Sequence, residues 1–163
     1  MKLDPVFFVQ GNRLIKISDN QTVNPESLKL IDISWAKVEL SENSYDEAFL
    51  ASLREELKAL DGQDKYVILS PSIDKKFETP EEIEAFITTV NHTARRLKDC
   101  TCIAGVLLPD ELLEKGIDSS SPAANLMETL AIKHAQYVYF VKKQSEDKYN
   151  LSNAVFFSSL VLL

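Results

Sequence analysis

The sequence is poor in the residues that form the common nucleotide-binding and hydrolase motifs. It has 4 glycines, and none falls in a Gly-rich phosphate loop or a dinucleotide-binding fingerprint. It also lacks the Gly-x-Ser-x-Gly turn that presents a nucleophilic serine. Its 2 histidines, His92 and His134, both fall on predicted helices, which argues against a Ser-His-Asp triad and a histidine-based metal site. We therefore expect no metal and no cofactor.

Cysteine is equally scarce. The 2 cysteines form the segment Cys100-Thr101-Cys102, and residues two apart on a strand share one face. A disulfide within this segment would be strained, so we predict two reduced core cysteines. Redox or metal chemistry is the alternative. His134 lies on an apolar helical stripe and is predicted to be a hydrogen-bonded structural histidine, with a catalytic role as the alternative.

Basic charge and long apolar runs are also missing. The net charge of -7 argues against a nucleic-acid partner and an anionic membrane surface. The apolar run AVFFSSLVLL falls short of the roughly 20 residues of a membrane-spanning helix. The opening MKLDPVFFVQ does not have the pattern of a signal peptide, which predicts a cytoplasmic protein.

What the sequence does contain is a regular alternation of strand and helix patterns. Two capping boxes, Ser44 with Glu47 and Thr79 with Glu82, predict helix starts, because hydroxyl and carboxylate satisfy the first free amides. The strands are predicted at 6–17 (a hairpin around Gly11-Asn12), 28–35, 65–70, 101–108, 136–143 and 154–163. The helices are predicted at 44–60, 79–98, 110–115 (with Asp110 as its cap) and 121–135.

This order predicts one α/β domain with a mixed, mainly parallel sheet flanked by helices. Residues 1–27 would form an N-terminal hairpin and loop, 28–142 a βα core, and 143–163 a C-terminal strand extension. The last strand is predicted to run antiparallel to the strand before it, which would make a second hairpin at the C-terminus.

The stretch KLIDISWAKVEL, residues 29–40, raises a question about Asp32. Apolar residues alternate up to Trp35 and then change phase, which indicates a bulge or the point where the chain leaves the sheet. A carboxylate on such a strand needs hydrogen-bonding partners or an accessible position. The sequence leaves open whether Asp32 is structural or functional.

Ligands gather at the C-terminal ends of the strands in open parallel sheets. Carboxylates there could perform acid–base chemistry, and an indole suits a sugar or another flat ligand. The candidate catalytic residues are Asp32, Asp74, Asp110 and Glu111. The candidate binding residues are Ser34, Trp35, Ser70 and Ser72. The alternative is that these side chains only cap helices.

The element order from Leu28 to about Val141 resembles the STAS domain of anti-sigma-factor antagonists, with YDEAFLASLREELKAL, KYVILS and CIAGVLLP as matching segments. That resemblance implies a non-catalytic regulatory module with a protein partner and possible self-association. The family's phosphorylated Asp-Ser-Ser-Gly motif is absent at the matching place, SPSIDKKFETPEE, where Ser72 or Thr79 would be the phosphorylated residue.

Two other readings remain. One is a small carboxylate-dependent hydrolase with its site at the strand ends. The other is a glycosidase-like βα reading of ISWAKVE, although 163 residues cannot form an eightfold barrel of about 250.

Overall fold

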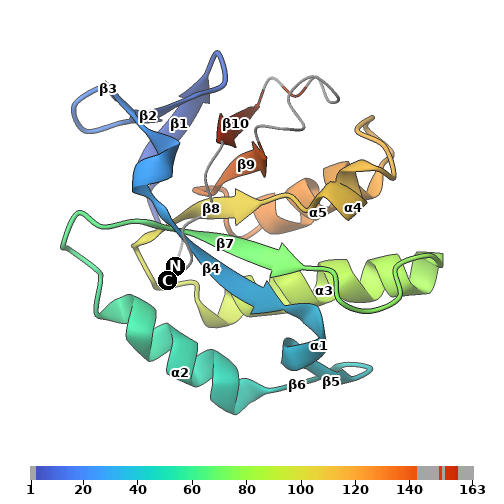
Figure 1. Ribbon diagram of the computed structural model, residues 1–163. Coiled ribbons are helices and arrows are strands. Elements are labelled where there is room, and N and C mark those ends of the chain that lie inside the picture. Colours follow the sequence, from blue (N-terminus) through green and yellow to red (C-terminus); the bar gives the residue numbers. More distant parts are fainter. Residues whose placement is uncertain (1–2, 143–150, 152, 158–163) are drawn as a thin grey trace.

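The computed structural model describes residues 3–142, 151 and 153–157 of the chain. Its centre is a five-stranded sheet in the order β10-β9-β8-β7-β4, in which every neighbouring pair is parallel (Figure 1). The strands are β4 (Lys29–Ser34), β7 (Val67–Ser72), β8 (Ile103–Leu107), β9 (Val138–Lys142) and β10 (Ala154–Phe157). The prediction of a single α/β domain with a mainly parallel sheet is confirmed.

The interior strands are built from short apolar runs. β8 is buried along its whole length, as expected for a strand covered on both faces. Gly105 makes its pairing with β9 possible, because a Cβ at this position would lie 1.7 Å from the Val138 carbonyl oxygen. The predicted strands KYVILS and CIAGVLL are adjacent and parallel, as β7 and β8.

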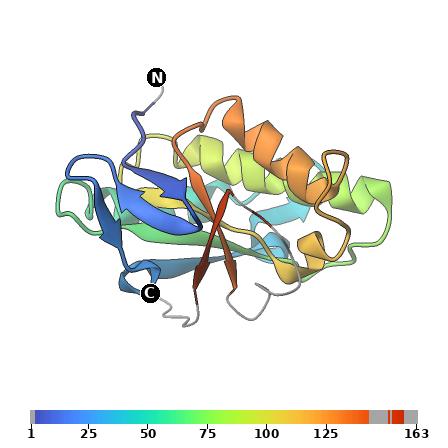
Figure 2. The same ribbon diagram turned by 90° about the horizontal axis from the view of Figure 1, so that it is seen from above.

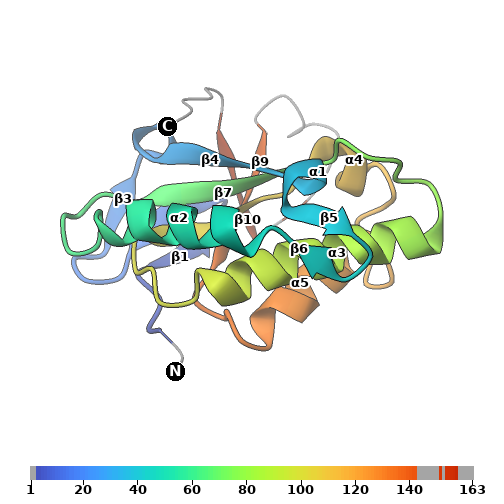
Figure 3. The same cartoon turned by 90° about the horizontal axis from the view of Figure 1, so that it is seen from below.

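Helices cover one face of this sheet (Figure 3). They are α2 (Glu47–Lys58), α3 (Pro80–Arg96) and α5 (Pro122–Ala131), with the short α4 (Asp110–Leu113) after β8. Leu50, Phe86 and Leu126 point from these helices into one apolar core. Successive strands are neighbours and their helices share one side, so the crossovers advance in one direction across the sheet.

A small antiparallel sheet covers the other face (Figure 2). It consists of β1 (Phe7–Gln10), β2 (Arg13–Lys16) and β3 (Gln21–Val23), followed by the 3-10 turn η1 (Pro25–Ser27). The predicted hairpin is confirmed, with Gly11 and Asn12 both at positive φ. The third strand falls in a segment predicted to be loop. Leu14 is fully buried against Ile68 and Phe140 of the large sheet.

The two predicted capping boxes fare differently. Thr79 and Glu82 form theirs as expected at the start of α3. Ser44 does not cap α2, because Ser44–Tyr45 is the strand β6, which pairs with β5 (Glu39–Ser41). Asp46 caps α2 instead, and its carboxylate accepts the Phe49 amide at 3.0 Å. The chain leaves the large sheet at Trp35, where the short helix α1 (Trp35–Val38) begins.

The C-terminal hairpin prediction is wrong. β10 pairs with β9 in parallel, with Ala154 opposite Tyr139. Residues 143–150, 152 and 158–163 lie outside the described part, and the rest of the predicted C-terminal strand falls among them.

None of the helices in the described ranges combines the length and the apolar character that a membrane span requires.

Candidate functional site

The face of the large sheet opposite the helices, here called the inner face, changes character along its strands. Its N-terminal half carries Leu30, Ile68 and Phe140, which are buried under the small sheet. Every second residue on a strand shares a face, so the same face continues as polar residues toward the strand ends. We call these residues the polar inner face: Asp32, Ser34, Ser70, Ser72 and Lys142.

Asp32 is the accessible carboxylate of this surface. It lies on β4, an edge strand of the sheet, directly opposite Ser70 of β7. The Ser72 hydroxyl donates a hydrogen bond of 2.9 Å to Asp32 Oδ1. Asp32 is exposed and also lines an open pocket of about 390 Å³ between the edge of β4 and α2. The carboxylate is therefore oriented by a neighbouring strand and open to a ligand.

Asp74 and Ser34 have a structural task at the same strand ends. The Ser34 hydroxyl donates a hydrogen bond to Asp74, whose other oxygen accepts the Ala36 amide at 2.8 Å. Ser34 Oγ in turn accepts the Lys37 amide at 3.2 Å, as an N-terminal cap does. Asp74 thus holds the start of α1 in place, which matches the alternative that such loops cap helices.

Trp35 does not offer an open ring to a ligand, contrary to the expectation from the sequence. Only 2% of it is exposed, and it packs on Phe77 and Phe86 with ring centroids 6.2 and 5.4 Å away. Its Nε1 donates a 3.0 Å hydrogen bond to Glu39, which also pairs with Lys75 at 2.7 Å. Glu39 was not among the candidate residues predicted from the sequence.

The remaining candidates lie beyond β8. Asp110 is the first residue of α4 and Pro109, not Asp110, is the N-cap residue. Lys142 of β9 approaches Asp110, with Nζ 3.9 Å from Oδ2. Glu111 is exposed on the same turn. Lys142 was not predicted as a site residue from the sequence. Its position two residues after Phe140 on the same strand places it on the inner face.

The two cysteines are buried free thiols. Burial, reinforced by Asp61 nearby, raises the pKa of Cys100 to about 11 and the pKa of Cys102 to about 12. Both thiols therefore stay protonated at neutral pH and are poor nucleophiles. Within residues 3–142, 151 and 153–157, no group of three or more His, Cys, Asp or Glu side chains is placed to hold a metal ion.

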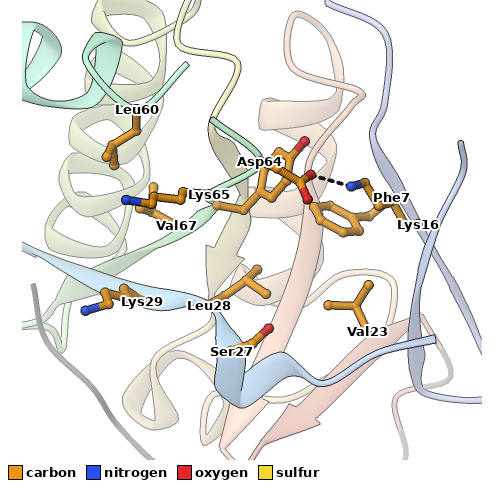
Figure 4. Close-up of a pocket in the computed structure, with 11 residues that line it drawn as sticks. Phe7, Lys16, Val23, Ser27, Leu28, Lys29, Leu60, Asp64, Lys65 and Val67 are labelled. Carbon is orange, nitrogen blue, oxygen red and sulfur yellow. Dashed lines mark hydrogen bonds and ion pairs between the residues drawn. The ribbon is translucent and has the colours of Figure 1, made fainter. Parts of the chain in front are cut away.

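A larger apolar pocket, of about 580 Å³, lies at the opposite ends of the strands (Figure 4). Phe7, Leu28 and Val67 form its walls, between the small sheet and the beginnings of β4 and β7. Lys16 at its rim is paired with Asp64. It shares no residue with the polar inner face, so the strand ends and this pocket are separate features.

The sequence matches no protein-family model and no curated protein sequence. The fold resembles solved structures of glycoside hydrolases. GH5_18 from Bifidobacterium longum subsp. infantis aligns with a TM-score of 0.52 and 14% identity over 76% of this chain and 36% of its own. Endo-glycoceramidase II from Rhodococcus sp., in its cellobiose-like isofagomine complex, aligns with a TM-score of 0.58 and 10% identity over 98% and 60%. The same enzyme in its cellobiose-like imidazole complex gives 0.57 and 11% over 83% and 49%.

These likenesses correct the functional prediction. The chain spans about a third to three-fifths of the lengths of these structures, and at such low identity the shared property is the fold. The neighbours are glycoside hydrolases, so the prediction of a non-catalytic, STAS-like regulatory module is wrong. The order of strands and helices was not enough to predict the function, because alternating strands and helices are common to many parallel-sheet folds.

Proposed function

We propose that this chain is a glycoside-hydrolase-type domain that binds saccharide on the polar inner face and hydrolyses a glycosidic bond there. The observation that carries the proposal is the change from an apolar, covered surface to a polar, open one at the C-terminal ends of the strands. Active sites of parallel βα folds lie at this end. The resemblance to glycoside hydrolase structures supports the same reading.

Asp32 is the central group of the proposed site. It is exposed and fixed by the Ser72 hydroxyl, while Ser70 lies opposite it on the next strand. Hydroxyls beside a carboxylate can donate to and accept from sugar hydroxyls. Asp74 is excluded from the reactive pair because both of its oxygens serve the start of α1.

Glycosidic hydrolysis needs a second carboxyl group, and Asp110 is best placed to supply it. One carboxylic acid protonates the leaving oxygen while the other group activates water or attacks the sugar. Asp32 lies on the edge strand β4 and Asp110 follows β8, with β7 between these two strands. Two strand spacings of roughly 4.8 Å set a minimum of about 10 Å between the two positions, because Asp110 also lies beyond the end of β8 whereas Asp32 lies within β4. This spacing favours the arrangement with a water between the carboxyl groups, at roughly 6.5–9.5 Å, over the roughly 5–5.5 Å of a directly attacking carboxylate.

The ligands of the neighbouring structures suggest the probes. The Rhodococcus enzyme was solved in cellobiose-like imidazole and isofagomine complexes and as a lactosyl-enzyme intermediate, so we propose β-linked glycosides as the substrate class. Hydrolysis of 4-nitrophenyl β-cellobioside and β-lactoside would be followed by release of nitrophenol. Saturable binding of cellobiose and lactose would be measured separately by calorimetry.

Asp32→Asn is expected to lower the hydrolysis rate by roughly 100-fold or more, since an acid–base group contributes about 10²–10⁴-fold. Asp19→Asn makes the same chemical change at an exposed residue of the β2–β3 turn and is expected to leave the rate unchanged. Equal rates for wild type and Asp32→Asn would contradict the assignment of Asp32. A folded wild-type protein that neither binds the disaccharides nor cleaves the glycosides would contradict the proposed function.

A further inference from the structure

A basic pocket lies near the N-terminal ends of β8 and β9. It is open and has a volume of about 790 Å³. Its walls come from α2, from the end of α3 and from the turns that lead into β8 and β9. The lining residues are Arg54, Arg95, Arg96, Lys98, Asp99, Lys133 and His134. Arg95, Arg96 and Lys98 are close together in the sequence, and the fold brings Arg54 and Lys133 beside them.

His134 provides the second observation at this pocket. The sequence predicts a hydrogen-bonded structural histidine, but the structure gives neither ring nitrogen a partner within the described residues. The residue is only 1% exposed, and its ring stacks on Tyr137 with centroids 5.4 Å apart. A buried donor without an acceptor is unfavourable, because it has lost its hydrogen bonds to water. His134 lines the pocket, so a ligand oxygen would satisfy one ring nitrogen once the ring turns toward the pocket.

The positive charge around His134 is only partly neutralised. Asp99 accepts a 3.0 Å hydrogen bond from Arg54 Nε, and Glu47 pairs with Arg96 at 2.8 Å. Arg95, Lys98 and Lys133 are exposed, and the described part of the chain supplies no ion pair to any of them. Burial, together with Arg95 and Lys98, lowers the pKa of His134, so the ring keeps one N–H donor and adds no charge.

We propose that this pocket binds a compact phosphate-type oxyanion, as inorganic phosphate or a small phosphate monoester. Arg95, Lys98 and Lys133 supply the charge, and the His134 ring donates to one oxygen. Arginine suits this role because its planar fork matches two oxygens of one phosphate group. The positive charge is confined to one pocket, and the chain as a whole has a net charge of -7. A polynucleotide would contact a longer surface and be repelled by the acidic remainder, so the pocket suits a small anion better.

The test uses the whole chain with inorganic phosphate and, in a second arm, glycerol 3-phosphate, both at constant ionic strength set with chloride. Binding is measured by calorimetry and by NMR of the His134 ring. We expect saturable one-to-one binding that shifts the His134 resonances and leaves the indole N–H of Trp35, at the other end of the strands, unmoved. The compound that binds with the lower Kd, inorganic phosphate or glycerol 3-phosphate, identifies the form of phosphate that the pocket binds.

Arg95→Gln with Lys98→Gln is expected to weaken binding by at least 10-fold. Lys29→Gln with Lys65→Gln removes the same charge from exposed lysines at the other pocket and should change affinity by less than 2-fold. Circular dichroism confirms that each variant is folded. If the double variant does not fold, Lys133→Gln carries the test, with an expected loss of about 3-fold.

Three results would overturn the proposal. The first is no saturable binding of either phosphate compound by the folded wild type. The second is equal weakening in the Arg95/Lys98 and Lys29/Lys65 variants, which would indicate general charge attraction. The third is tighter binding of an oligonucleotide, with an affinity that falls steeply with salt, which would assign the pocket to nucleic acid.

Discussion

At the scale of single residues, the partners of a charged side chain decide its role more than its position in a pattern. Glu39 and Asp32 are both acidic residues of the stretch 29–40, in which only the part up to Trp35 was predicted as strand. Glu39 is 6% exposed and is held by the Trp35 indole and Lys75, whereas Asp32 is open to solvent. The alternation of residues 29–40 could not separate these two outcomes, because α1 turns the chain between them.

Lys75→Met is expected to destabilise the protein by roughly 1–2 kcal/mol, because it leaves the Glu39 carboxylate without its cation. The loss stays below the roughly 3–5 kcal/mol of a fully buried pair since the Lys75 side chain is 35% exposed. Urea unfolding followed by circular dichroism measures it. Combining Lys75→Met with Glu39→Gln should recover part of the loss. Lys76→Met, at the exposed neighbour, is the control; a loss equal to that of Lys75→Met would contradict the pairing argument.

At the scale of elements, a capping motif predicts the start of a helix correctly where no other segment pairs with the backbone of its residues. Thr79-Pro80-Glu81-Glu82 starts α3 as the sequence predicts, with the Glu82 amide donating to Thr79 Oγ1 at 3.1 Å. Ser44 carries an equally good local signal, but its backbone is used in the β5–β6 pairing. Asp46, two residues later, caps the helix instead, and α2 begins at Glu47.

Ser44 and Asp46 can therefore be compared directly as candidate N-cap residues of α2. Asp46→Ala is expected to lower the free energy of unfolding by about 1 kcal/mol, the typical value of an N-cap, because the Phe49 amide loses its acceptor. Ser44→Ala is expected to change it by less than about 0.5 kcal/mol, as for an exposed residue. Both are measured by thermal and urea unfolding. A larger effect at Ser44 than at Asp46 would restore the cap predicted from the sequence.

At the scale of the whole molecule, the small sheet decides where a ligand can bind. It covers the N-terminal half of the inner face and leaves the C-terminal half open, where Asp32 and Ser72 lie. The helices cover the opposite face completely enough to bury Trp35. Among the residues that the structure describes, the C-terminal half of the inner face is thus the part of the large sheet that is both polar and accessible.

Leu14→Ala tests whether the small sheet and the large sheet fold as one unit. Leu14 is fully buried between them, and truncating such a residue costs about 2–5 kcal/mol. We expect one cooperative unfolding transition at lower urea concentration, measured by circular dichroism and by the fluorescence of Trp35. Ile17→Ala is the control, since Ile17 is 46% exposed. Two separate transitions in the Leu14 variant would show that the sheets unfold independently.

The protein partner that the resemblance implied stays a prediction, because the structure contains one chain and does not test it.

The sequence by itself determined the fold class, the parallel pairing of β7 with β8 and the start of α3, because buried apolar runs and capping residues act over a few neighbours. It also placed Asp32, Ser70 and Ser72 at the strand ends. Only the tertiary structure decided the direction of β10, the burial of Trp35 and Glu39, and the gathering of Arg95, Lys98 and Lys133 around His134. These outcomes depend on contacts between segments far apart in the chain, and local periodicity carries no information about which distant surfaces meet.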